Sequence, residues 1–240
     1  MPHYLNLIDK KMNGIINIAK NVGTNVYENL YDEIVKINDN EDIYFNIETN
    51  GGTLCSLQKI IRVLKKIPNK KIAVIKKSAH SAGSILALAC DEIQLSENAT
   101  FSAIDPQSST VVEINNLKIL NIKIIPELYG EGDHNKNIVE YYSKVISHHR
   151  NKIKMLINNK YSEETKENIL KNMFDAPLDH EELFFKEDLE SFGLDIKTID
   201  KNLEEDIKPK PKNYLKKIQL IAIAGLMVVS IVFFKFYWKN

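Results

Sequence analysis

Hydrophobic residues in the first half of the chain follow two different periods, one typical of strands and one typical of helices. Residues 42–49 (DIYFNIET) place an apolar side chain at every second position, which predicts a strand, and a glycine pair at 51–52 follows as a turn. Residues 54–67 carry apolar side chains at helical spacing, and the apolar run at 71–75 predicts a second buried strand. Elsewhere the same criteria predict strands at 14–19, 91–95 and 100–102, and helices at 26–37, 84–90 and 136–158. Because strands that alternate with helices favour parallel pairing through right-handed crossovers, we expect an α/β fold, a parallel sheet with flanking helices.

The last part of the chain has a different pattern, because it is apolar on every side. Residues 218–234 run seventeen positions without a charge, which is the lower end of the length that crosses a hydrocarbon core as a helix. Eleven of them are Leu, Ile, Val or Phe, and together these favour insertion into a bilayer by about 3 to 7 kcal/mol. An aromatic cluster at 236–238 follows, as is typical of a membrane interface. We therefore expect one C-terminal transmembrane helix at 218–238.

A basic linker precedes this apolar segment. Residues 206–217 contain five lysines, whereas only two lysines follow the apolar run. Because lysines concentrate on the cytoplasmic side of a membrane span, the preceding domain should be cytosolic. Pro209 and Pro211 stiffen the linker and hold that domain away from the bilayer. We expect one globular domain at 1–205, a Pro/Lys linker at 206–217 and a single-pass tail anchor.

Composition narrows the classes of partner. The 32 basic and 32 acidic side chains cancel, so no net field attracts nucleic acid, and we expect no nucleic-acid partner. Cys55 and Cys90 lie in apolar patterns and have no Cys or His neighbour at metal-ligand spacing, so we interpret both as core residues. We expect no metal and no cofactor.

A turn of small residues follows the predicted strand at 71–75. It reads SAHSAG at 78–83 and leads directly into an apolar helix. Ser81 lies at the mouth of that helix, where Ala82 and Gly83 leave its hydroxyl uncrowded and the helix amino terminus creates a positive potential. This arrangement is suited to a nucleophilic serine, although a tight packing corner has the same composition.

Three segments in this order resemble the ClpP/crotonase superfamily: IETNGGT at 47–53, SAHSAGSILALACDEI at 78–93 and IDPQ at 104–107. The likeness is strongest to its membrane-associated serine proteases, the serine dehydrogenase proteinase and signal peptide peptidase A groups. It resumes at 176–196 (APLDHEELFFKEDLESFGLDI), which is similar to the carboxy-terminal stretch of the serine dehydrogenase proteinase group. The resemblance implies a ClpP/crotonase-type fold, a serine endopeptidase acting on a peptide or protein substrate, and assembly into a homo-oligomer.

The resemblance also implies roles for individual residues. The serine of the second segment is the nucleophile in this family, and it corresponds to Ser81. The oxyanion hole takes one backbone amide from the glycine pair and one from the residue after the nucleophile, here Gly51 and Ala82.

The general base is where this sequence departs from the family. The Clp branch has a histidine at the position of Asp105, and a carboxylate of ordinary pKa is a poor base for a serine hydroxyl. Other branches use a lysine, for which Lys118, Lys123 and Lys144 lie in the right region, and His180 in the APLDH segment is a further candidate. Asp105 has an equally good interpretation as a structural hydrogen-bond acceptor. The residues alone do not choose among these alternatives.

Two competing functions use the same fold. A catalytically inactive scaffold or adaptor at a membrane would keep the fold and the tether but lack the base. A crotonase-like enzyme would use the same two amides to polarise an acyl thioester, but the sequence shows no dedicated acidic pair in the expected loop. We therefore favour a membrane-anchored serine peptidase.

Overall fold

A computed structural model of the chain describes residues 14–19, 21–34, 36–38, 41–106, 112–114, 117–119, 133–177, 179–199 and 203. The chain divides into two compact units, Met1–Leu203 and Glu204–Asn240, and every described residue belongs to the first. None of the helices in the described part has the length and apolar character that crossing a membrane requires. The linker predicted at 206–217 and the transmembrane helix predicted at 218–238 lie outside the described residues.

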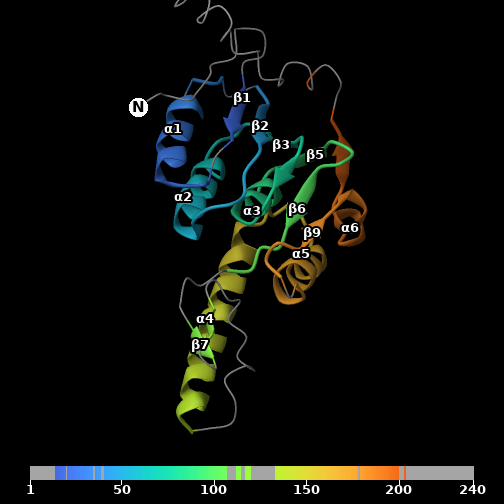
Figure 1. Ribbon diagram of the computed structural model, residues 1–240. Helices are drawn as coiled ribbons and strands as arrows, with labels where there is room; N and C mark the ends of the chain where they lie inside the picture. Colours follow the sequence, from blue (N-terminus) through green and yellow to red (C-terminus); the bar gives the residue numbers. More distant parts are fainter. Residues whose placement is uncertain are drawn as a thin grey trace, which may run out of the picture. The chain divides into compact units, whose positions relative to one another are not determined.

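A five-stranded parallel sheet forms the centre of the first unit (Figure 1). Its strands, in spatial order, are β1 (Ile15–Ile18), β2 (Ile43–Ile47), β3 (Lys71–Ile75), β5 (Glu92–Leu95) and β10 (Ile196–Thr198). Each neighbouring pair is parallel. The central strand β3 is buried from Ile72 to Ile75, as expected for a parallel sheet covered on both faces. The predicted α/β fold with a parallel sheet and flanking helices is confirmed.

The helices of the described residues are α1 (Thr24–Ile34), α2 (Leu54–Leu64), α3 (Ala82–Leu88), α4 (Asp133–Leu156), α5 (Glu163–Leu170), the π-helix η2 (Lys171–Asp175) and α6 (Lys186–Ser191). Helix α2 begins after Thr53, whose hydroxyl accepts the N–H of Ser56, and it buries an apolar face at spacings of three and four. It ends at Leu64, earlier than the predicted 67, because Pro68 disfavours helical backbone at the residue before it. Figure 1 shows α1 beside α2, and α6 near β9.

A smaller three-stranded sheet lies next to the start of α3. It consists of β4 (Ser78–Ala79), β6 (Thr100–Ser102) and β9 (Leu183–Phe184); β6 pairs in parallel with β4 and antiparallel with β9. Of these three strands, the sequence pattern predicts only β6, because β4 and β9 have two residues each and are too short to show a period. A separate hairpin pairs β7 (Val112–Ile114) with β8 (Leu117–Ile119). Through β9, the smaller sheet brings a segment far along the chain next to the Ser81 turn.

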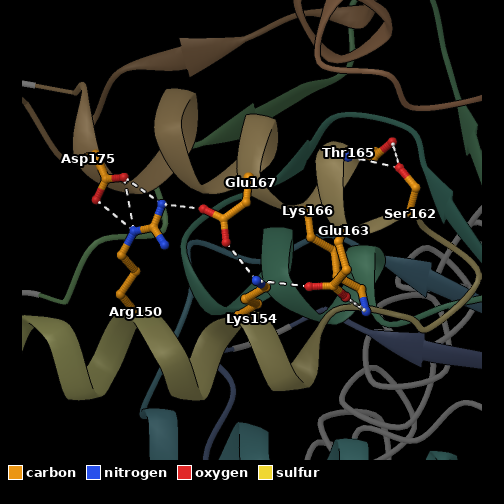
Figure 2. A network of polar contacts seen from close by, with 8 residues as sticks. All are labelled: Arg150, Lys154, Ser162, Glu163, Thr165, Lys166, Glu167 and Asp175. Carbon is orange, nitrogen blue, oxygen red and sulfur yellow. Dashed lines mark hydrogen bonds and ion pairs between the residues drawn. The ribbon is translucent and has the colours of Figure 1, made fainter.

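Ion pairs connect the carboxy-terminal half of α4 to α5 and η2 (Figure 2). Arg150 of α4 binds Asp175 and Glu167, each at 2.9 Å from its Nη2. Lys154, one turn further along α4, binds Glu167 at 2.6 Å and Glu163 at 2.9 Å. We call these five residues the α4–α5 network. The network fixes η2 beside α4, and η2 in turn supports the segment that follows β6, since the N–H of Ile104 donates to the Met173 carbonyl at 2.8 Å.

Candidate active site

Ser81 lies in a strained turn between β4 and α3. Its backbone has φ of 50° and ψ of −115°, and it is the only non-glycine residue with positive φ in the described ranges. Such a conformation costs about 1 to 3 kcal/mol and persists only when the surrounding structure enforces it. The Ser81 side chain makes no capping hydrogen bond to α3. A serine on a strained strand-to-helix turn, with a hydroxyl not used for capping, has the backbone geometry of a nucleophile.

Neighbouring backbone and side-chain groups hold this turn in place. The N–H of Ser81 donates to the hydroxyl of Ser102 on β6 at 2.8 Å. The N–H of Gly83 donates to the His80 carbonyl at 2.7 Å, and the N–H of Ile85 donates to the Ser81 carbonyl at 3.2 Å. The turn is therefore attached both to the first turn of α3 and to the neighbouring strand.

Gly51, the first glycine of the pair, lies against the serine, whereas Gly52 lies against Val22. Gly51 has φ of 120°, and a Cβ atom built on it would lie 2.7 Å from the Ser81 Cβ and 3.2 Å from its Oγ. Only a glycine allows this approach. The chain near the pair is fixed to the preceding turn, since the N–H of Val22 donates to the Gly51 carbonyl at 2.6 Å.

The backbone N–H groups around the serine differ in whether they already have a hydrogen-bond acceptor. The N–H of Gly51 donates to the Thr49 hydroxyl at 3.1 Å. The N–H groups of Gly52 and Ala82, by contrast, have no hydrogen-bond partner within the part of the chain that the structure describes. Of the two amides predicted as oxyanion donors, Ala82 is therefore uncommitted, and Gly51 is already engaged within its own turn.

The side chains of His180 and Asp105 are hydrogen-bonded to each other although the residues are 75 positions apart. The Nδ1 of His180 lies 2.8 Å from the Oδ1 of Asp105. The Asp105 side chain is 2% exposed and that of His180 is 23% exposed. The segments that carry them are joined by the N–H of Ala103, which donates to the Glu182 carbonyl at 3.2 Å. A neutral imidazole that donates Nδ1–H to a carboxylate has Nε2 as its acceptor, so the pair has the form of a general base with its orienting carboxylate.

Of the lysine candidates, only Lys144 has a side chain that the structure describes, and it is not part of a comparable arrangement. Lys144 lies on α4 with its side chain 74% exposed and paired with Glu140 at 2.6 Å. Lys118 lies on β8, where only the backbone is described, and Lys123 lies outside the described residues. Lys144 is therefore a surface lysine in this structure.

His80, next to the serine, contacts a neighbouring strand and has a structural role. Its Nε2 lies 3.0 Å from the Thr100 hydroxyl on β6. Burial lowers the pKa of His80, with Glu181 acting in the opposite direction. His80 therefore links the turn to β6 through its contact with Thr100.

Two contacts of the site were not predicted from the sequence. The first is the pairing of Asp105 with His180, which were treated as separate candidates. The second is the hydroxyl of Ser102, which binds the Ser81 backbone. Neither has a signal in local spacing, because both depend on the pairing of β6 with β4 and β9.

The parallel α/β fold and the strained serine turn agree with the class of fold that the sequence resemblance implied, the ClpP-like class. Residues 11–210 match the family model of the ClpP-like SDH-type serine proteinase, and the chain belongs to this family. This confirms the predicted resemblance to the serine dehydrogenase proteinase group.

Two curated relatives come from Methanocaldococcus jannaschii. The protein named uncharacterized protein MJ0137 is 26% identical over 161 residues, which cover 67% of this chain and 54% of that protein. Uncharacterized protein MJ1495 is 26% identical over 156 residues, covering 63% of this chain and 51% of that protein. The chain thus spans about half the length of the curated relatives it matches.

A solved structure shows the same fold. It is a serine-to-alanine mutant of the 1510-N membrane-bound stomatin-specific protease, which matches with a TM-score of 0.55 over 82% of this chain and 84% of that one. The sequence identity is 16%, so the likeness shows the fold alone.

Proposed function

We propose that the chain is a membrane-anchored serine endopeptidase in which Ser81 is the nucleophile and His180 is the general base. The Ser81 Oγ attacks the peptide carbonyl carbon while its proton passes to His180 Nε2. The same proton then passes to the leaving amine as the C–N bond breaks and an acyl-enzyme remains. In the second half of the reaction, water attacks the ester carbon while its proton passes to His180 Nε2. The same proton then passes to the Ser81 Oγ as the ester bond breaks, which restores the free enzyme. Asp105 holds the imidazole in the required tautomer and orientation.

The observation that carries this proposal is the contact between His180 Nδ1 and the buried Asp105 at 2.8 Å. Asp105 stands where the Clp branch has its histidine, which left the chain without an evident base. The pairing with His180 supplies an imidazole and a carboxylate together. The exposed Lys144 is paired with Glu140 on its own helix, so no comparable pairing supports it as the base.

For the oxyanion we propose the N–H groups of Ala82 and Gly52. Ala82 is retained from the sequence-based prediction. The Gly51 N–H would have to leave the Thr49 hydroxyl in order to act, whereas the Gly52 N–H has no such partner among the described residues. Each donor is worth about 3 to 4 kcal/mol of transition-state stabilisation. Gly51 then serves by allowing the backbone to approach Ser81 closely.

The membrane tether and the assembly are part of the same proposal. The apolar run at 218–234, the aromatic cluster at 236–238 and the basic linker at 206–217 support a membrane-spanning segment with the peptidase domain on the cytosolic side. The family supports a protein substrate and a homo-oligomer. The solved relative is membrane-bound and stomatin-specific according to its name, which makes a membrane-associated protein substrate a reasonable first choice.

Labelling with a fluorophosphonate probe tests the nucleophile. The wild-type chain should be labelled at Ser81, and Ser81→Ala should lose the label completely. Ser162→Ala is the matched control, since Ser162 only caps α5 and should leave labelling unchanged. A folded wild-type protein that takes up no label would support the alternative of an inactive scaffold, and coenzyme A retained by the purified protein would support the thioester alternative.

A further inference from the structure

Two serine hydroxyls are buried behind the Ser81 turn, and neither belongs to the proposed triad. Ser84 on α3 is 0% exposed and Ser102 on β6 is 3% exposed. A buried hydroxyl is costly unless it is hydrogen-bonded, so the partners of these two groups indicate what they do.

Ser84 connects backbone groups of two strands. Its hydroxyl lies 2.6 Å from the Ala79 carbonyl on β4, to which it donates, and it accepts the N–H of Ser102 at 3.2 Å. It therefore fixes where β6 lies relative to the end of β4, which leads directly into the Ser81 turn.

Ser102 acts on the nucleophile's own backbone. Its hydroxyl accepts the N–H of Ser81 at 2.8 Å and can donate its proton to the Ala103 carbonyl at 3.2 Å. Because its proton is directed to that carbonyl, the oxygen is left as an acceptor for the Ser81 N–H. This bond fixes the orientation of the peptide group between His80 and Ser81.

The strained backbone needs such an acceptor. A serine at φ of 50° relaxes toward an ordinary conformation unless contacts oppose this, and relaxation rotates the side chain together with the Ala82 N–H that follows. Ser102 is 3% exposed, so its hydroxyl, and not bulk water, is the acceptor of the Ser81 N–H.

We propose that Ser102 is a positioning residue, whose hydroxyl holds the Ser81 N–H and thereby keeps the nucleophile in its reactive orientation. This inference rests on the proposed function of Ser81. It adds a residue that touches neither substrate nor oxyanion and acts on the rate through the backbone of Ser81.

The test measures fluorophosphonate labelling of the 240-residue chain in detergent as a function of probe concentration and pH. Ser102→Ala should lower the maximal labelling rate constant by about tenfold to a hundredfold, because a misplacement of about 1 Å has effects of this size. The probe concentration at half-saturation, the midpoint of the pH profile and the final labelled fraction should stay at their wild-type values. Loss of folded protein alone would lower the labelled fraction and leave the rate constant unchanged.

Two further variants complete the design. Ser102→Cys keeps the size of the side chain but replaces the oxygen by a weak acceptor, so it should be slowed even if the alanine variant does not fold. Ser162→Ala removes a serine hydroxyl remote from the site that accepts the Thr165 N–H, and should label at the wild-type rate.

The outcomes separate the two proposals. A wild-type protein that does not label refutes the role of Ser81 and this inference with it. Labelling of the wild type together with wild-type rate constants in Ser102→Ala or Ser102→Cys refutes the role of Ser102 alone. If Ser162→Ala lost as much labelling rate as the Ser102 variants, the loss would reflect a general decrease in the stability of the protein. That result would also overturn the inference.

Discussion

The site and the α4–α5 network hold polar groups together in opposite ways. At the site the acceptors are buried, with Asp105 2% exposed and Ser102 3% exposed. In the network the charges are shared and reach solvent, with side-chain exposures of 47% for Glu167 and 72% for Glu163. A lost contact in the network leaves charges that water can solvate, whereas a lost contact at the site leaves a buried polar group without that partner. The comparison teaches that the few buried contacts should control the rate, and that the many exposed contacts should each add little to stability.

The largest effect is expected on the labelling rate constant of Ser81, when a buried hydrogen-bond acceptor of the site is replaced by a side chain of the same shape. Asp105→Asn should lower the labelling rate constant of Ser81 by about a thousandfold to ten-thousandfold, because an amide favours the wrong tautomer of the imidazole. The rate constant with the fluorophosphonate probe measures this.

Asp175→Asn is the matched control, since it makes the same chemical change in the α4–α5 network, and it should label at the wild-type rate. If Asp105→Asn labelled within tenfold of the wild type, the contact with His180 would be structural and the comparison would fail.

An intermediate effect is expected at Glu92, which is buried but paired with exposed lysines. Burial acts to raise the pKa of Glu92, but hydrogen bonds from Lys197, Lys70 and Gln94 lower it to about 2 from an ordinary value of 4.5. Since the folded pKa is lowered, this stabilisation is present above pH 4.5 and is lost as the pH falls toward 2. Glu92→Gln should therefore reduce the free energy of unfolding at pH 7 by about 1 to 2 kcal/mol, after a discount for solvent screening at the lysines.

Denaturant unfolding at a series of pH values checks this result. The difference between Glu92→Gln and the wild type should shrink steadily as the pH is lowered from 4.5 toward 2. A difference that stayed constant over that range would mean that packing, and not charge, makes the contribution of Glu92.

The smallest effect is expected in the α4–α5 network. Arg150→Gln should lower the free energy of unfolding by about 0.5 to 1 kcal/mol, and less at 1 M salt, because the pairs it loses are screened by solvent. Lys144→Gln, which removes one isolated exposed pair with Glu140, should lower the free energy of unfolding by less than Arg150→Gln does.

Unfolding and labelling of these two variants should be measured together. Labelling rates should be unchanged in both. A large loss of labelling rate in Arg150→Gln would instead show that the network controls the site through η2 and Ile104. The claim that only the buried contacts of the site control the rate would then be wrong.

Most of the central fold could be predicted from local pattern. The strands β2 and β3 and the helix α2 were recognisable because burial on one or both sides leaves a period of two, an apolar run or a helical period in the sequence. The short strands β4 and β9 could not be found this way. They exist because β6 lies between them, and pairing with a distant strand leaves no period in two residues.

The sequence by itself determined the parallel α/β core, the serine at the start of a helix and the glycine pair before it, because each depends on residues adjacent along the chain. Only the tertiary structure decided that Asp105 pairs with His180, that Gly51 is engaged by Thr49, and that Ser102 binds the backbone of Ser81. The physical reason is the direction and short range of hydrogen bonds, which depend on where folded segments meet and not on their separation in sequence.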